Sequence, residues 1–150
     1  MPLSCLCAPE SLRSFDRPAL VAGHPGHELK VFGWMSEYRP RLYLITDGGG
    51  RHGVSRVPTS AALAGRHGIQ RGETFGSASD SRIYHAILER DFSFFLNLVE
   101  ELSSSFVEHS VDLVAGDAAE GFNPTHDLCR AIIDGAVLMA ERATGRTVAN

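Results

Sequence analysis

The sequence has no long apolar run, little cysteine and no excess of basic charge, and each shortage excludes a class of protein. No uninterrupted apolar stretch approaches the roughly 18 residues of a membrane-spanning helix, so no membrane partner is expected. The 14 basic residues are outnumbered by 18 acidic ones, and the arginines are scattered rather than clustered. A nucleic-acid groove needs a basic patch, so no DNA or RNA partner is expected either.

Only three cysteines are present, Cys5, Cys7 and Cys129. An odd number with one closely spaced pair does not make a disulfide framework, which favours a reducing, cytoplasmic location. The segment 1–18 also lacks a cationic start followed by an apolar stretch, so it is interpreted as a loose N-terminal leader and not as an export signal.

The rest of the composition is typical of one globular domain. With 150 residues, of which 43% are hydrophobic and 21% charged, the chain is long enough to form one hydrophobic core and too apolar for a disordered protein. We therefore expect a single domain over residues 19–150.

Short apolar runs predict three buried strands, over 19–23, 42–46 and 111–116. Their continuous hydrophobicity favours burial on both faces, as in a parallel sheet. Apolar residues at helical spacing predict helices over 31–38, 59–67, 92–106 and 128–140, and the stripe along 92–106 is expected to face the core. The remainder of the glycine-rich segment 47–81 is expected to be loop. This order predicts an α/β fold, a Rossmann-like three-layer α/β/α arrangement with a mostly parallel sheet.

Histidines follow two of the predicted strands. His24 and His27 lie in the turn after the first strand, and His126 follows the third. Ligands in such sheets bind beyond the carboxyl ends of the strands, so neighbouring strands would bring these imidazoles together. Three imidazoles with one open position are typical of a catalytic zinc site. By spacing alone, each histidine also fits a helix cap or a surface residue, and both interpretations stay open.

The same residues carry a resemblance to a known family. His24–Glu28, with the sequence HPGHE, resembles the His-Pro-Asp-Asp-Glu signature of the PIG-L/LmbE-like zinc-dependent N-acetylglucosaminyl deacetylases. Asn123–His126 resembles their His-Pro-Asp-His element, and Thr46–Gly48 is similar to their Thr-x-Gly segment. The resemblance runs over residues 19–139, and the combination of motifs is more specific than any one of them.

The resemblance implies a zinc-dependent hydrolase that removes an N-acyl group, typically acetyl, from an amino sugar or a glycosylated metabolite. Carried over by position, His24, His27 and His126 would bind the zinc, with His27 in place of the family's aspartate ligand. Three imidazoles also accept other divalent metals. Arg56, in the loop after the second predicted strand, would contact the substrate.

Two positions depart from the family pattern. Gly26 stands where the family has its general-base aspartate, and Asn123 where it has a histidine that assists the tetrahedral intermediate. Glycine cannot accept a proton, and the Asn123 amide could only hydrogen-bond an oxyanion. Asn123 before Pro124 is also a typical helix N-cap. The departures leave an alternative open: a non-catalytic relative that binds a metal or a sugar without turnover.

A replacement base is sought among carboxylates expected at the same edge of the sheet. The candidates are, in order, Glu120, Asp117 and Asp47. Asp117 could instead accept hydrogen bonds from the turn that follows it. Tyr84, in a helix that Asp80 could cap, is a further candidate for substrate contact.

The other histidines and the third cysteine lack a motif. Surface positions are expected for His52, His67 and His109, and Cys129 is expected to be a small core residue. The chain ends at Asn150, soon after the helix of the last motif, whereas domains of the resembled family usually continue. We therefore expect a partner subunit to complete the substrate wall, which would make the protein a homo-oligomer.

Overall fold

The computed structural model describes residues 15–150. Its sheet has four strands, all parallel, in the order β3-β2-β1-β4. The strands are β1 (Pro18–Ala22), β2 (Arg41–Thr46), β3 (Arg71–Ala78) and β4 (Leu113–Gly116). The α-helices are α1 (Phe32–Tyr38), α2 (Val57–Arg66), α3 (Asp80–Glu89), α4 (Phe92–Glu108) and α5 (Pro124–Thr144), and short 3-10 helices form η2 (His27–Val31) and η3 (Gly50–His52).

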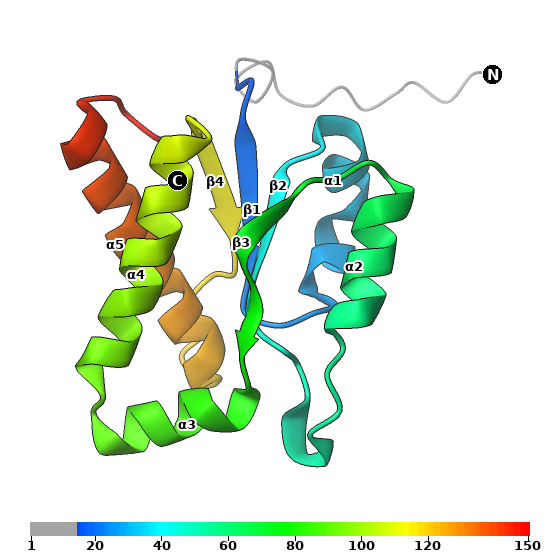
Figure 1. Ribbon diagram of the computed structural model, residues 1–150, viewed down its shortest axis with the longest axis vertical. Helices are drawn as coiled ribbons and strands as arrows, with labels where there is room; N and C mark the ends of the chain where they lie inside the picture. The colour runs from blue at the N-terminus through cyan, green and yellow to red at the C-terminus, as the bar shows by residue number, and fades with distance from the viewer. Residues whose placement is uncertain (1–14) are drawn as a thin grey trace.

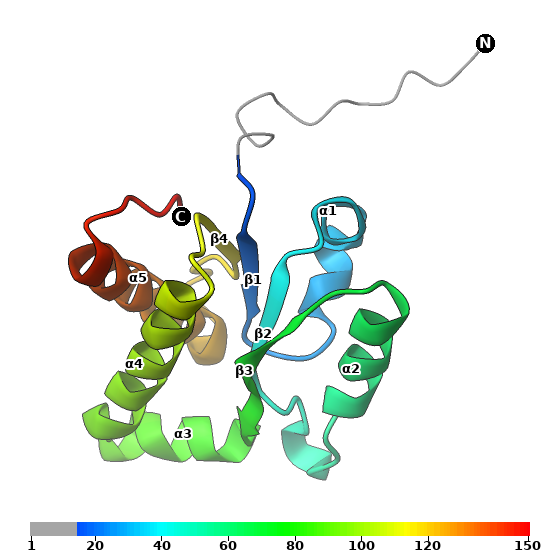
Figure 2. The same ribbon diagram turned by 45° about the horizontal axis from the view of Figure 1, so that its top comes forward.

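Helices cover both faces of this sheet, with α1 and α2 on one side and α4 and α5 on the other (Figures 1 and 2). The predicted Rossmann-like three-layer α/β/α fold is confirmed. Helix α3 does not join either layer but crosses the edge at which the strand arrows point (Figure 1). None of the described helices is both long and apolar enough to cross a membrane.

The two central strands are buried on both faces, and alternate side chains fill two separate cores. Val21, Tyr43 and Ile45 pack toward α4 and α5 with Leu102 and Ile133. The intervening residues of the same strands pack toward α1 and α2, in a cluster that includes Leu20, Ala22, Met35, Leu42, Leu44 and Ala64. This double burial explains why the runs 19–23 and 42–46 are continuously apolar instead of alternating.

The prediction of loop between the second helix and position 79 was wrong, because Arg71–Ala78 forms the edge strand β3. Only Thr74 and Ala78 of this strand are buried, and its sequence, RGETFGSA, contains no apolar run. An edge strand with one partner needs little hydrophobicity, and charged residues on it discourage pairing with other chains.

Two further predictions need correction. Phe92 and Leu96 were expected in the core but are 70% and 58% exposed, because the buried stripe of α4 runs through Leu98, Leu102 and Phe106 and leaves them on the adjacent helical face. Strand β1 begins at Pro18, one residue inside the predicted leader. The rest of that leader up to position 14, with Cys5 and Cys7, lies outside the described residues.

Candidate metal centre

All four strands deliver polar residues to one edge of the sheet. His24 follows β1 and His27 begins η2, while Thr46 ends β2. Asp80 begins α3 two residues after β3, and Asp117 follows β4 directly. Since β1 lies between β2 and β4, the turn after β1 is flanked by residues from both neighbouring strands.

The three predicted histidines meet at this edge. The ring centroids of His27 and His126 are 4.6 Å apart, those of His24 and His27 5.2 Å, and those of His24 and His126 5.4 Å. The rings meet edge to face, with interplanar angles of 65° to 83°. His126 reaches them from the first turn of α5, whose N-terminus lies beside the end of β1 because β1 pairs with β4.

His24 is held through its Nδ1 atom. This atom lies 2.9 Å from Oδ1 of Asp80 and 2.8 Å from Oγ1 of Thr46, whose hydroxyl donates to the carbonyl of Gly23. Burial lowers the pKa of His24; the Asp80 charge opposes this effect, and His27 and His126 add to it. The net direction favours the neutral ring, which is the form that binds metals.

Asp80 remains ionised beside His24. Burial acts to raise the pKa of Asp80, but the neighbouring Thr46 hydroxyl, the amide of Gly50 and His24 outweigh it and lower the pKa. The Gly50 amide donates to Oδ2 of Asp80 over 2.7 Å, so Asp80 joins His24 to the loop before α2.

His27 is held in the same way by Asp117. Its Nδ1 atom lies 2.9 Å from Oδ2 and 3.0 Å from Oδ1, and Oδ2 also accepts the amide hydrogen of Gly23 over 2.7 Å. Burial raises the pKa of Asp117, but the hydrogen bonds from His27 and Gly23 outweigh it and the pKa is lowered. Asp117 therefore bonds to the turn after β1, and not to the turn that follows it in sequence.

His126 completes the pattern with Glu120 and Asn123. Nδ1 of His126 lies 2.8 Å from Oε2 of Glu120. Asn123 is the N-cap of α5, as predicted, because its Oδ1 accepts the amide hydrogen of Thr125. Its Nδ2 is consequently the donor toward Nε2 of His126, 3.1 Å away.

These contacts determine which nitrogen of each ring carries the proton. A carboxylate only accepts hydrogen bonds, so Nδ1 of each histidine donates to its carboxylate partner. A neutral ring then has its lone pair on Nε2, the arrangement usual for metal-ligating histidines, whose other nitrogen donates to a carboxylate or carbonyl. The donor set of His24, His27 and His126 fits zinc in its chemistry.

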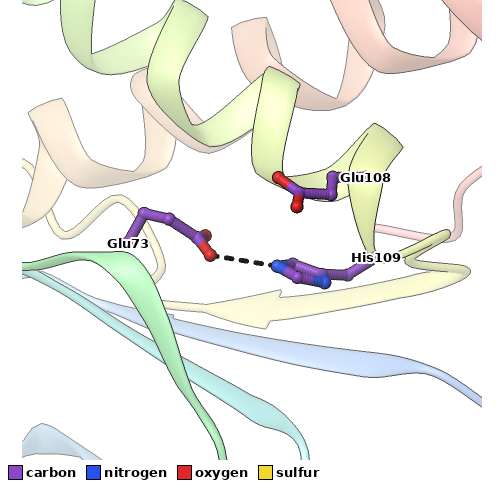
Figure 3. A group of neighbouring side chains, drawn as sticks. All are labelled: Glu73, Glu108 and His109. Carbon is purple, nitrogen blue, oxygen red and sulfur yellow. Dashed lines mark hydrogen bonds and ion pairs between the residues drawn. The ribbon is translucent and has the colours of Figure 1, made fainter.

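A second group also has the chemistry of a metal site. Glu73 of β3 and the neighbouring pair Glu108 and His109 at the end of α4 each present a ligand atom, and these atoms lie within 4.8 Å of one another (Figure 3). Among residues 15–150 this is the only group whose ligand atoms all lie within that distance, so the histidine triad does not meet the same criterion. The Glu73 group could hold a metal ion, although two of its three members are exposed.

Glu73 already has partners within the protein. His109 lies 3.0 Å from its Oε1 atom, and the hydroxyl of Ser105 donates to Oε2. Burial acts to raise the pKa of Glu73, but the hydrogen bonds from Ser105 and His109 lower it to about 2. His109 was predicted at the surface; it is half-buried and forms this ion pair.

The three candidate bases occupy different positions. Both oxygens of Asp117 contact His27, whereas Glu120 contacts His126 through Oε2 and its side chain is 30% exposed. Asp47 accepts the amide hydrogens of Gly49 and Asp80 through Oδ1, so it shapes the loop after β2. Glu120 thus keeps the most accessible carboxylate of the three.

The turn between His24 and His27 depends on glycine. Gly26 has a φ of 103°, which L side chains rarely adopt, and its amide donates to the buried Glu28 over 2.6 Å. The backbone of Gly48 approaches so closely that a Cβ atom there would lie 2.8 Å from Pro25 and 2.9 Å from Arg56. Glycine at both positions allows the loops after β1 and β2 to pack together.

The predicted substrate residues Arg56 and Tyr84 line two different clefts. Arg56 donates from Nε to the carbonyl of Gly48 over 2.7 Å, and it lines a cleft of about 610 Å³ that includes Pro25 and Gly26. Tyr84 lines a cleft of about 540 Å³ that includes His24. Both clefts therefore border the turn that carries the histidines.

Sequence reasoning missed the role of Asp80, which it treated as a cap. The cap of α3 is Ser79, whose hydroxyl accepts the amide hydrogen of Arg82 over 3.1 Å. The missing signal was β3: once Arg71–Ala78 is identified as a strand, Asp80 stands just beyond its carboxyl end, where binding residues gather.

No family model matches the chain, and the comparisons with curated proteins and with solved structures found no match.

Proposed function

We propose that the protein is a zinc-dependent hydrolase that cleaves an amide, by N-deacetylation of an amino sugar or a glycosylated metabolite. One observation carries the proposal: three histidines at the carboxyl edge of a parallel sheet, each with Nδ1 held by its own carboxylate. Another divalent metal could take the place of zinc in the same donor set.

Bound zinc supplies a Lewis acid and lowers the pKa of a coordinated water to about 7. The chain itself orients the imidazoles through Asp80, Asp117 and Glu120. Of these, Glu120 is the candidate to accept a proton, because its Oε1 atom has no hydrogen-bond partner among the described residues. Asn123 could donate from Nδ2 to a developing oxyanion once His126 turns away from it.

The alternative is a binding protein that holds a metal or a sugar without turnover. Gly26 favours it, because glycine has no side chain that could act as a base at the position where the resembled family has one, and its φ of 103° disfavours other residues there. The guanidinium of Arg56, 3.8 Å from where a Cβ of residue 26 would lie, occupies the neighbouring space.

The metal content of the purified full chain tests the site. After stripping with chelator and adding zinc back, elemental analysis is expected to show zinc in the wild type and its loss in His24→Ala and His126→Ala. His109→Ala is the matched control, because it removes the only histidine of the Glu73 group. Zinc retained in both site variants and lost in His109→Ala would contradict the proposed centre.

Acetate release from N-acetylated sugars tests the activity. The zinc-loaded wild type is expected to turn over, and His126→Ala to lose both zinc and hydrolysis. Unchanged hydrolysis after the loss of zinc would refute the metal-dependent reaction. Zinc binding with no turnover by the wild type, followed by activity in Gly26→Asp but not in Gly26→Ala, would establish the binding alternative, since both variants carry the same backbone strain.

A further inference from the structure

The cleft beside His24 has the walls of a binding site. It measures about 540 Å³, within the usual size of small-molecule pockets, and is lined by the loop before α2 and by one face of α3. His24 and Asp80, which are hydrogen-bonded to each other, belong to its lining. The cleft is therefore continuous with the candidate metal centre.

Two of the residues that α3 contributes to this cleft have large, exposed apolar side chains. Tyr84 and Leu88, one helical turn apart on α3, are 44% and 80% exposed, and both line the cleft. Ser81, in the preceding turn, continues the same helical face. The exposed side chains of Tyr84 and Leu88, next to the candidate metal centre, provide an apolar surface against which a ring can pack.

The loop that lines the cleft carries a cation. Arg51 belongs to η3 and lines the cleft, and none of the carboxylates among residues 15–150 forms an ion pair with it. The position of η3 relative to α3 is maintained by the hydrogen bond from the Gly50 amide to Asp80. Within the described part of the chain, Arg51 has no ion-pair partner although the chain carries an excess of acidic residues, with a net charge of −4. Its guanidinium can therefore bind an anion through two parallel hydrogen bonds.

We propose that this cleft binds the part of the substrate next to the amide, and that this part is a ring carrying an anionic substituent. The ring lies against Tyr84 and Leu88, and its carboxylate or phosphate binds Arg51. This inference rests on the proposed hydrolase function and adds the class of substrate. The ring can be aromatic or a sugar, and the experiment separates the two.

Binding is measured on the metal-free full chain at about pH 8, above the ordinary histidine pKa of about 6.5, so that no metal attracts the anion and imidazolium contributes least. Two pairs of probes are titrated by calorimetry: 4-acetamidobenzoate against acetanilide, and N-acetylglucosamine 1-phosphate against N-acetylglucosamine. We expect the anion of one pair to bind about tenfold or more tightly than its neutral counterpart, which is the size of a charged hydrogen bond. The preferred pair identifies the ring.

Variants test which residues cause the preference for the anionic probe. Arg51→Gln is expected to remove the preference for the anion, and Tyr84→Ala to weaken both members of the pair equally. Arg146→Gln, at an exposed position near the C-terminus, is the matched control and should change neither. Equal affinity for both members in the wild type, a preference that survives Arg51→Gln, or no binding of any probe would overturn the inference. Zinc titration of the same samples tests the proposed function separately, because Arg51→Gln and Tyr84→Ala leave the histidines in place.

Discussion

At His24, the surrounding residues give the two ring nitrogens different hydrogen-bonding roles. Nδ1 is committed to Asp80 and Thr46, so the neutral ring presents Nε2 as its free acceptor. His27 is divided in the same way, whereas at His126 Nδ1 contacts Glu120 and Nε2 accepts a hydrogen bond from Asn123. Three separate carboxylates thus act on the donor set, and each of them can be altered without removing a histidine.

Replacing Asp80 with asparagine is expected to weaken zinc binding about 10- to 100-fold, because partners of this kind orient the ligand and raise its basicity. The measurement is a zinc titration against a competing chelator. Asp134→Asn is the control, since Asp134 is an exposed residue of α5 that contacts Arg130 and Asn150. An affinity unchanged in Asp80→Asn would show that the pairing with His24 does not support metal binding.

The raised pKa of Tyr43 predicts how the free energy of unfolding changes at alkaline pH. Burial raises the pKa of this fully buried phenol to about 12, and its hydroxyl donates to Ser105 over 2.7 Å. Because the folded pKa lies above the unfolded value of 10, the contribution is complete below pH 10 and is lost as the pH rises toward 12, by roughly 2–3 kcal/mol.

Urea unfolding of the wild type and of Tyr43→Phe between about pH 8 and pH 12 tests this. The variant is expected to be about 1 kcal/mol less stable at neutral pH, because the hydrogen bond to Ser105 is lost, and to show a shallower alkaline decline. Parallel declines in the two proteins would mean that other groups cause the alkaline loss.

Among the elements, β3 packs closely against the neighbouring strand β2 at Gly72. Gly72 lies directly over the ring of Tyr43, where a Cβ atom would come within 2.0 Å of Cε1. A methyl group added to Gly65 in α2 would meet no atom outside its own helix within 4 Å, and the backbone there is helical. Replacing either glycine with alanine adds the same methyl group, so the two positions differ only in the atoms that surround it.

Gly72→Ala is expected to destabilise the protein by about 1–3 kcal/mol, because an added methyl group forces β3 away from Tyr43. Gly65→Ala is expected to stabilise it by up to about 1 kcal/mol, because alanine has the higher helix propensity. Chemical denaturation of both variants measures the free energy of unfolding. A neutral Gly72→Ala would show that β3 moves freely over the sheet.

For the whole molecule, Cys129 reports on the integrity of the core. It is 1% exposed within the cluster between the sheet and the helices α4 and α5, and burial raises the pKa of its thiol. Both effects suppress thiolate formation, and the thiolate is the reactive species.

In a Cys5→Ser/Cys7→Ser variant, Cys129 is expected to resist alkylation in the folded protein and to react fully in denaturant. The measurement is the rate of labelling, followed by intact mass. Core destabilisation should speed the reaction, so Gly72→Ala in the same background is expected to label faster than Gly65→Ala. Rapid labelling of the parent variant would mean that this core opens readily.

The strands differ in how far the sequence could predict them. β1 and β2 were recognised because central strands of a parallel sheet are continuously apolar, and β4 because it lies in the apolar run 111–116 even though it is an edge strand. β3, the other edge strand, has no such run, and only Thr74 and Ala78 are buried. Missing β3 concealed Asp80, which lies 56 residues from His24 and meets it only in the fold. Asn123 was predicted correctly as a cap because capping is a local interaction.

The sequence by itself determined the α/β class and marked the turns that carry His24, His27 and His126, because hydrophobic periodicity and turn residues act over a few positions. Only the tertiary structure decided which carboxylate holds each imidazole and that Gly26 has a left-handed backbone. The pairings of His24 with Asp80 and of His27 with Asp117 arise from the strand order β3-β2-β1-β4, which brings residues 56 and 90 positions apart into contact. A local sequence pattern does not specify that strand order.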